Sequence, residues 1–455
     1  MDFLPLGPEH SADWDAFCLE SRDAWFWHTI GWLDYTFAYR PDLKPRSLSF
    51  MVREGKRILA AVPLLLEHHR EDGAERIKFS FGGGYNPAPA LANDLTADQR
   101  DDLLERIFGT IDDLALELGA VQTLFHVPSL APRRLKPEYA PCNELLRYGY
   151  LDATLNTRVI DLRLPENELR DGLRRNHRRN IETGREKLRT RVFAGAGFTV
   201  EKFESYRLMH HAAAGRVTRP LRTFELMSDW LAAGRGFLSE AYDSTGRGVG
   251  YVVYMDYKGS VYGLSAANDP EVERVLPVRH LLEWDGIQWM RERGLEFYEI
   301  GDQHFGALPY DFPDQKNVNI SHFKYGYGGV TTPHVFAEKF HSREYWELTQ
   351  RRRSELFAAA YAWPAADGGR AKELLRRFEK ALKPAEAEIE VPPDVARAAE
   401  EIVAANPAVV KSWREGGENA VHFLVGRAMQ GAGRGKNPKL LMKAISAALA
   451  KAALP

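Results

Sequence analysis

The sequence has few cysteines, no long apolar run and almost no net charge. Its two cysteines, Cys18 and Cys142, lie far apart and match no metal-ligand spacing, which argues against a disulfide scaffold and favours a reducing compartment. The longest apolar run, 58–66, is interrupted by Pro63 and is far shorter than the roughly 18 residues of a membrane-spanning helix. No signal-peptide pattern opens the chain. We therefore expect a cytoplasmic protein without membrane insertion.

The charge balance excludes a protein whose whole surface is basic. The 61 lysines and arginines oppose 63 aspartates and glutamates, which leaves a formal net charge of −2. Any affinity for nucleic acid must therefore come from local patches. The length of 455 residues indicates about three domains, at roughly 150 residues per domain.

Strand-like and helix-like segments alternate through the first 350 residues, which predicts an α/β fold. A hairpin is expected at 47–66, and a helix from Thr96, its N-cap, to Gly119. The segment 166–231 is predicted to be helical. The later strands and the long helix are expected at 237–242, 248–256, 260–267, 278–293 and 296–300.

The order of these elements predicts two mixed-sheet domains of the same architecture, at 1–150 and 151–350. From about residue 351 the composition shifts to Ala, Arg, Glu and Leu, with prolines and glycines between short helical segments. We expect a helical linker at 351–390 and a small all-α domain at 391–455.

The most informative stretch is 320–329. Lys324 is a lone cation among aromatic residues and is followed by glycines that let a ligand approach the backbone. An ammonium in a partly desolvated pocket stabilises the oxyanion that develops in acyl transfer. The alternative is an ordinary strand that carries a solvated lysine. The aromatic neighbours are Phe323, Tyr325 and Tyr327.

The motif Phe323-Lys324-x-x-x-Gly328-Gly329 resembles the signature of the FemAB family of aminoacyl-tRNA-dependent transferases. The resemblance covers about residues 20–345, with Tyr327 where the family usually has phenylalanine. It implies two tandem domains of the GNAT acyltransferase fold and transfer of an amino acid from charged tRNA to an amine, typically on a cell-wall precursor. It also implies that Lys324 lies beside the tetrahedral intermediate and that Phe323 lines the same site.

Further candidates come from the positions of polar residues beside predicted elements. Asp302 and His304 follow a predicted strand end, where substrate-facing residues often lie, and Asp302 is a candidate for the base that takes a proton from the amine. Arg279 opens the long helix, where it would approach an acyl donor in a GNAT fold.

The histidine pairs 68–69 and 210–211 lack carboxylate or thiolate partners at metal spacing, so no metal and no cofactor besides the aminoacyl-tRNA co-substrate is expected.

The segment 170–191 is strongly basic, with nine Lys or Arg against three acidic residues. Such a helix face repels itself unless phosphates neutralise it, which favours a phosphate-rich ligand over a merely solvated surface. The candidate tRNA-binding residues here are Arg174, Arg175, Arg178 and Arg179.

The segment 391–455 resembles the tail domain of the GatB subunit of aspartyl/glutamyl-tRNA amidotransferase, which also forms YqeY-like proteins. The resemblance rests on four groups of residues: Asn406-Pro407, Trp413-Arg-x-Gly416-Gly-x-x-Ala420, Phe423-Leu-Val-Gly426-Arg-Ala-Met429 and Gly433-Arg-Gly-Lys-Asn-Pro438. It implies contact with tRNA, and nine basic against five acidic side chains agree with this role. The alternative is a small helical packing module. The candidate tRNA-binding residues are Arg427, Arg434, Lys436, Asn437 and Lys439.

Three functions compete: an aminoacyl-tRNA-dependent transferase, an acyl-CoA-dependent N-acyltransferase, and a non-catalytic tRNA-binding protein. The CoA enzymes of the GNAT fold hold pyrophosphate on a glycine-rich turn, whereas this chain has 274–279 without glycine at that place. The sequence therefore favours the first function. The acceptor is expected to be a cell-wall precursor, an amino-sugar nucleotide or a small natural-product amine.

Overall fold

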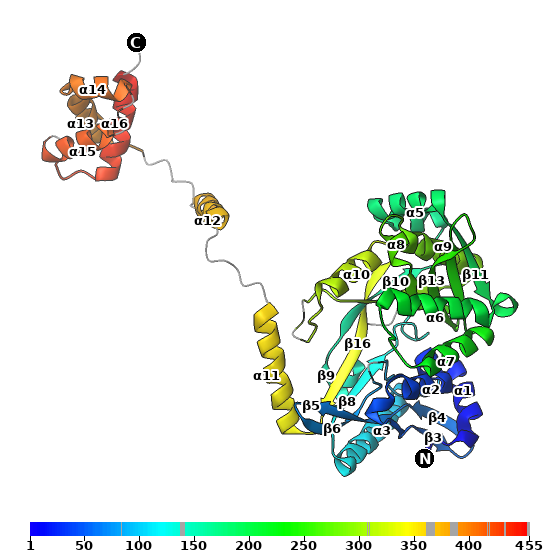
Figure 1. The fold of residues 1–455 in the computed structure, drawn as a ribbon. Coiled ribbons are helices and arrows are strands. Elements are labelled where there is room, and N and C mark those ends of the chain that lie inside the picture. Colours follow the sequence, from blue (N-terminus) through cyan, green and yellow to red (C-terminus); the bar gives the residue numbers. More distant parts are fainter. Residues whose placement is uncertain are drawn as a thin grey trace. The chain divides into compact units, whose positions relative to one another are not determined.

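Two units make up the chain, residues 1–361 and 362–455, each with its own internal contacts, and each is described by itself (Figure 1). The structure is a computed structural model, and it describes residues 1–82, 84–136, 142–306, 308, 310–360, 369–382, 390–415, 417, 419–431 and 434–452. The sequence-based boundary at 150 falls inside the first unit, and the predicted linker at 351–390 overlaps helices of both units. Division of the chain at those positions stays a prediction.

A twelve-stranded mixed sheet runs through the described residues of the first unit. Its strands follow the order β11 (Arg189–Ala194), β12 (Gly236–Tyr242), β13 (Gly248–Tyr257), β14 (Ser260–Asn268), β15 (Phe297–Gln303), β10 (Leu155–Asp161), β16 (Val330–Phe340), β8 (Ala120–Val127), β6 (Ala74–Phe79), β5 (Leu65–Glu71) and β2 (Arg46–Ser47), with β9 (Leu151–Asp152) paired to β16. A separate four-stranded sheet has the order β1 (Asp2–Pro5), β3 (Phe50–Glu54), β4 (Arg57–Val62) and β7 (Ala90–Leu91).

Helices cover these sheets or pack on other helices in the first unit (Figure 1). They are α1 (Ser11–Glu20), α2 (Ile30–Tyr39), α3 (Ala97–Leu118), α4 (Glu166–Gly172), α5 (Arg175–Lys187), α6 (Val200–Ala214), α7 (Leu221–Ala232), α8 (Pro270–Glu273), α9 (Val278–Glu292), α10 (Gln315–Tyr325) and α11 (Arg343–Ala360). The mixed α/β fold of two halves, followed by a helical C-terminal region, agrees with the expectation from the sequence.

Each half contributes one parallel strand pair to a sheet that is otherwise antiparallel. In the first half β6 runs parallel to β8, and in the second half β14 runs parallel to β15. The β14–β15 pairing ends at Tyr262↔Glu299, although β14 continues to Asn268 and β15 to Gln303. Because both strands continue without pairing, they separate, and the sheet opens between them.

Strand β16 joins the two halves. Its first residues, Val330 to His334, pair with β10 of the second half. Its later residues, Val335 to Phe340, pair with β8 of the first half. The chain therefore returns from the second half to complete the sheet of the first.

Separate apolar cores fix the two halves. The first packs α3 on the sheet through residues such as Leu103, Ile107 and Phe125, and the second packs α9 through Leu282 and Ile287. A third cluster, rich in tryptophan, combines residues of both halves. Burial of these side chains is the main favourable contribution to the stability of the unit.

The second unit contains α12 (Gly369–Leu382), α13 (Pro393–Ala404), α14 (Pro407–Arg414), α15 (Ala420–Gln430) and α16 (Pro438–Ala452). An apolar core that includes Val403, Leu424 and Leu441 holds the last four together. Among the helices of the described residues in either unit, none is both long enough and apolar enough to span a membrane.

In the first unit the structure corrects one sequence prediction and excludes one alternative. The segment 166–231 is not helical throughout, because Arg189–Ala194 form β11, the edge strand beside β12. Lys324 lies on a helix, α10, and not on the strand considered as its alternative. Asp314 is the N-cap of α10, and its side chain accepts a hydrogen bond from the Asn317 N–H at 2.7 Å.

Candidate functional site

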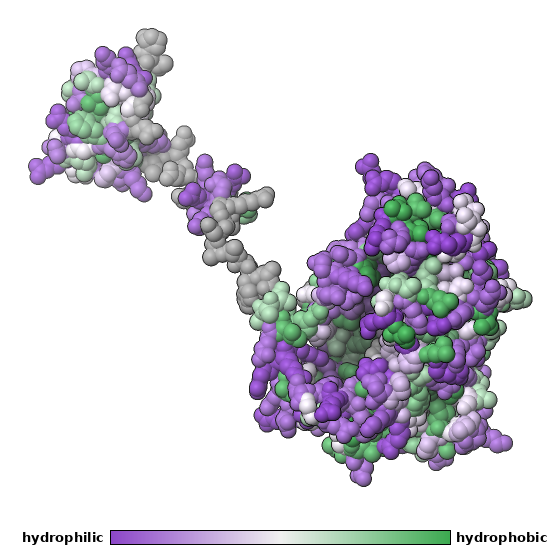
Figure 2. Space-filling view, in the orientation of Figure 1, coloured by the Kyte–Doolittle hydropathy of each residue, from purple (hydrophilic) through white to green (hydrophobic). Residues whose placement is uncertain are grey.

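A cavity of about 680 Å³ lies where β14 and β15 separate. Figure 2 shows that the surface of the first unit is hollowed next to α10. The walls of the cavity come from β14, β15 and four helices, α6, α8, α9 and α10. The lining residues are Ala213, Ala266, Ala267, Asn268, Pro270, Glu273, Arg279, His280, Ile300, Lys316, Ile320, Phe323 and Lys324.

Lys324 lies on the last turn of α10, at the wall of this cavity. Its Nζ donates a hydrogen bond to the backbone carbonyl oxygen of Asp302 at 2.8 Å. Burial lowers the pKa of Lys324, while the negative charge of Asp302 opposes that shift. The ammonium is therefore held in one position in a poorly hydrated place, where its charge acts strongly on a bound substrate.

Gly301 makes room for this ammonium. It has a φ of +103°, and a Cβ at this position would lie 2.9 Å from Lys324 Nζ. The β15–β10 register also shifts here, between Arg158 and Val159. An irregular, glycine-containing strand end thus brings the Asp302 carbonyl within reach of Lys324.

Replacing Gly301 with alanine is expected to cost stability and activity together. A positive φ in a non-glycine residue costs on the order of 1–3 kcal/mol, and displacement of the ammonium is expected to lower transfer about 10-fold or more. Gly246→Ala is the matched control, because Gly246 has a φ of +84° and open space around its Cβ position. Thermal melts should show similar losses for both variants, and transfer assays a loss for Gly301→Ala alone. Equal activity of the two variants would contradict this reading of Gly301.

Next to Lys324 lies a group of buried and partly buried ionisable side chains. His334 Nδ1 lies 2.5 Å from Asp302 Oδ1, and Tyr85 donates a hydrogen bond to Asp302 Oδ2 at 3.1 Å. Burial disfavours the charge on Asp302, but His334 and Lys324 outweigh it and hold the pKa of Asp302 at about 2. A carboxylate held at this pKa takes up a proton poorly near neutral pH, which disfavours Asp302 as the base.

The same group has donor atoms suited to a metal ion. Among the described residues, Glu299, Asp302 and His334 are the three whose ligand atoms all lie within 4.8 Å of one another. Glu299 also accepts a hydrogen bond from the Thr157 hydroxyl at 2.6 Å. Because the His334 nitrogen and the Asp302 carboxylate already form an ion pair, a metal would have to break that pair to bind. The expectation of no metal stays a prediction.

The aromatic residues beside Lys324 have different surroundings. The ring of Phe323 packs against the rings of His280 and Tyr327. The Tyr327 hydroxyl donates a hydrogen bond to the His280 backbone carbonyl oxygen at 3.3 Å. Tyr325 is exposed, and its ring lies between the guanidinium groups of Arg158 and Arg174, 4.3 and 4.5 Å from the ring centroid. Phe323 therefore lines the cavity, Tyr327 supports it from within the core, and Tyr325 faces outward.

Arg279 and His304, the other candidates near the site, are both paired with acids. Arg279 lines the cavity, and its Nε lies 2.8 Å from Glu283 Oε2. His304 Nδ1 lies 2.9 Å from Asp311 Oδ1, and His304 is not part of the cavity wall. The structure thus brings Lys324, Phe323 and Arg279 to one cavity and leaves His304 outside it.

The basic helix α5 begins next to the end of α10. The Arg174 backbone N–H donates to the Gly326 carbonyl oxygen at 2.9 Å. Arg175 and Arg179 are exposed, while Arg178 lies 3.9 Å from Asp171. This surface therefore adjoins the segment that carries Lys324.

In the second unit the predicted tRNA-binding residues lie on α15, on α16 and on the loop between them. Lys436 forms an ion pair with Asp394, and Asn437 Oδ1 accepts a hydrogen bond from the Lys439 N–H at 3.0 Å, at the start of α16. Arg427 lies over the ring of Phe423, 6.0 Å from its centroid. Of the glycine-rich loop, Gly433 and, earlier in the chain, Gly416 lie outside the described residues.

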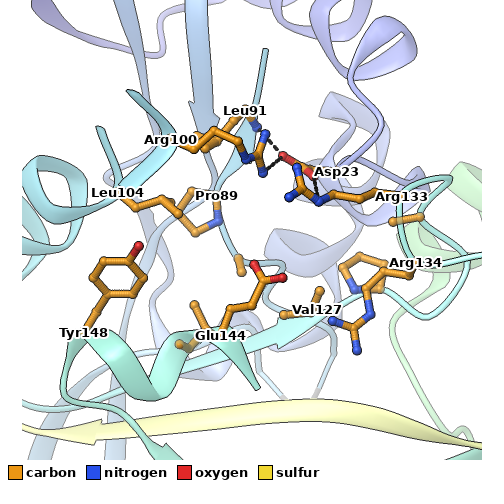
Figure 3. A pocket seen from close by; sticks show the side chains of 14 residues that line it. Asp23, Pro89, Leu91, Arg100, Leu104, Val127, Arg133, Arg134, Glu144 and Tyr148 are labelled. Carbon is orange, nitrogen blue, oxygen red and sulfur yellow. Dashed lines mark hydrogen bonds and ion pairs between the residues drawn. The ribbon is translucent and has the colours of Figure 1, made fainter. Parts of the chain in front are cut away.

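A second cavity, of about 60 Å³, lies in the first half (Figure 3). Arg100 and Arg133 both turn toward Asp23, at N–O distances of 2.7 and 3.8 Å. The Asp23 carboxylate thereby offsets part of the positive charge of the two arginines at this small cavity. Its volume is far below that of the cavity beside Lys324, which remains the candidate site.

Sequence reasoning missed Glu273, His334 and Tyr85. His334 follows a proline in an unremarkable strand, and its partner Asp302 lies 32 residues earlier. The signal that the sequence offers for His334 and Tyr85 is the general preference of histidine and tyrosine for buried, hydrogen-bonded positions.

Two domain families match this chain. Residues 168–310 match the acetyltransferase (GNAT) domain, and residues 366–449 match the GatB domain. The GatB match begins at residue 366, earlier than the boundary of 391 expected from the sequence, and so takes in α12. No curated protein matches the chain.

Among the solved structures that are similar to this chain, FemX supports the fold. The crystal structure of FemX is 12% identical, with a TM-score of 0.51, and the match covers 77% of this chain and 100% of that one. L-PGS from Bacillus licheniformis is 14% identical, with a TM-score of 0.48 and coverage of 78% and 98%. A tandem GNAT protein from the clavulanic acid biosynthesis pathway is 14% identical, with a TM-score of 0.40 and coverage of 75% and 98%. The tandem GNAT-like fold implied by the sequence resemblance to the FemAB family is confirmed, and the segment that resembles the GatB tail matches that domain.

Proposed function

We propose that the chain transfers an amino acid from aminoacyl-tRNA to an acceptor amine. The observation that carries this proposal is the partly buried ammonium of Lys324, at the wall of a cavity where β14 and β15 separate. The GatB domain supports tRNA as the carrier, because the sequence resemblance of that segment is to a tRNA-contacting tail. The acceptor is a cell-wall precursor, an amino-sugar nucleotide or a small natural-product amine.

The chemistry is direct aminolysis of an ester. The acceptor nitrogen attacks the carbonyl carbon of the aminoacyl ester, a C–N bond forms, and the C–O bond to the tRNA ribose breaks. The proton that the amine loses ends on the departing ribose oxygen. In this mechanism Lys324 stabilises the negative charge on the carbonyl oxygen or on the leaving oxygen, and the cavity walls orient the ester.

The experiment that tests this function is incubation of the protein with a full set of charged tRNAs and a cell extract. We expect one or a few tRNAs to lose their amino acid only when protein and extract are both present. Mass spectrometry of the extract then identifies the aminoacylated amine. Retention of every amino acid on its tRNA would overturn the proposal.

An acyl-CoA-dependent transferase is the second candidate, and the start of α9 argues against it. One carboxylate oxygen of Glu273 accepts a hydrogen bond from the Arg279 N–H at 3.2 Å, close to where a CoA enzyme of this fold would hold pyrophosphate. A pyrophosphate there would meet a carboxylate rather than free N–H groups.

Acetyl-CoA is therefore expected neither to bind nor to donate. Isothermal calorimetry with acetyl-CoA at up to about 1 mM should show no heat of binding above dilution. Any binding would then have a Kd above about 1 mM, which corresponds to a binding free energy weaker than about −4.1 kcal/mol. Micromolar binding would favour the CoA-dependent function over the tRNA-dependent one.

A further inference from the structure

The cavity wall has one acidic residue among its described lining residues, Glu273, at the end of α8. Its side chain is partly buried, and its carboxylate makes one hydrogen bond, to the Arg279 N–H. The nearby Arg279 guanidinium is paired with a different acid, Glu283. Within the described part of the chain, no lysine, arginine or histidine lies at ion-pair distance from Glu273.

A partly buried carboxylate without a cationic partner is unfavourable. Burial raises the pKa of Glu273 to about 7, although the Arg279 N–H and the charge of Arg279 act in the opposite direction. A cation that entered the cavity would remove this cost, because a buried charge is stabilised when it is paired and hydrogen-bonded.

The other groups of the cavity fit the remaining parts of an aminoacyl ester. Lys324 supplies a donor for the carbonyl oxygen. Apolar side chains, such as Ala267, Ile300 and Ile320, form walls that suit an amino-acid side chain. An aminoacyl ester has one further polar group, the α-ammonium, and Glu273 is the carboxylate on the cavity wall.

We propose that Glu273 binds the α-ammonium group of the aminoacyl residue and so makes the cavity selective for acyl donors that have a free α-amine. This inference rests on the proposed function and adds to it the chemical feature by which the donor is recognised. A carboxylate at the start of α9 also stabilises that helix, a role that would not depend on the donor. The experiment separates these two roles.

Binding of paired tRNA analogues tests the inference without the acceptor. One member of each pair carries alanine or leucine on tRNA through a stable 3′-amide, and the other carries the matching α-hydroxy acid, lactate or leucate. For the wild-type protein we expect at least one amine-bearing member to bind about 10- to 100-fold more tightly than its hydroxy counterpart, the range of one charge-assisted hydrogen bond.

Glu273→Gln keeps an oxygen acceptor for the Arg279 N–H but removes the charge, so the two members should then bind within about 2-fold of each other. Glu271→Gln is the matched control on the same short helix, because Glu271 is exposed, pairs with Arg274 and does not line the cavity. It should retain the wild-type preference. Thermal melts establish that both variants are folded.

Equal affinity of the wild-type protein for both members of each pair, with both bound more tightly than uncharged tRNA, would overturn the role of Glu273 and leave the proposed function standing. Failure to distinguish any charged tRNA from uncharged tRNA would overturn both. Persistence of the preference in Glu273→Gln would also reject the assignment, since the wild-type cavity would then recognise the amine through another group.

Discussion

Lys324→Met is expected to lower the rate of transfer by about 10²–10³-fold, the effect of removing one oxyanion stabiliser. Methionine retains much of the length of the side chain but has no positive charge and no donor. The Kd for tRNA should change little, because the ammonium acts on the reacting ester and not on the tRNA body. Single-turnover rates at saturating protein measure the first quantity, and filter binding measures the second.

Lys56→Met provides the control for this prediction. Lys56 is exposed in the turn between β3 and β4, and its replacement should leave both the rate and the Kd unchanged. Wild-type turnover in Lys324→Met would reject the role of Lys324. It would instead favour the third function considered for this chain, a tRNA-binding protein without catalytic activity.

Removal of residues 362–455 is expected to weaken tRNA binding for every tRNA sequence and to reduce its dependence on salt. The cut leaves the cores of the first unit whole, because the second unit has its own apolar core. Binding through phosphates releases counterions, so the slope of log K against log salt reports how many phosphates are neutralised. Single-turnover transfer from tRNA that is already bound should survive the deletion.

A triple variant that replaces Arg434, Lys436 and Lys439 with glutamine should reproduce much of this effect. The slope is expected to fall by up to about 2–3 if each residue contacts a phosphate. The control replaces Lys56, Arg70 and Arg106, which are exposed on the first unit, and so changes the net charge equally. Unchanged affinity and slope after deletion of the second unit would contradict its role in tRNA binding.

The helices and strands that the sequence predicts well have strong local signals, such as a capping box or a regular apolar face. Helix α3 has a regular apolar face, a capping box at Thr96 and Gly119 in the left-handed conformation at its end. Its bounds, Ala97–Leu118, therefore agree with the expectation. Strand β11 lacks such signals, because it is an edge strand without a buried residue and it begins with the polar residues Arg189, Thr190 and Arg191.

The site depends on contacts that no local pattern records. Asp302 and His334 lie on β15 and β16, the two strands that flank β10, where they pair opposite Thr157 and Leu155 respectively. Their meeting follows from the register of three strands and not from spacing along the chain. The sequence could propose Lys324 through its resemblance to a family, but not the group of side chains that surrounds it.

The position of β16 also determines when the enzyme can first become active during its own synthesis. Val335 pairs with Val127, which leaves the ribosome 208 residues earlier. At a synthesis rate of roughly 5–20 residues per second, the edge of β8 stays unpaired for about 10–40 s until β16 has been synthesised. Such a long-range pairing is slow to form and leaves an unpaired strand edge that chaperones can bind. A nascent chain without β16 also lacks His334, so the surroundings of Lys324 are completed only when the first unit is almost fully translated.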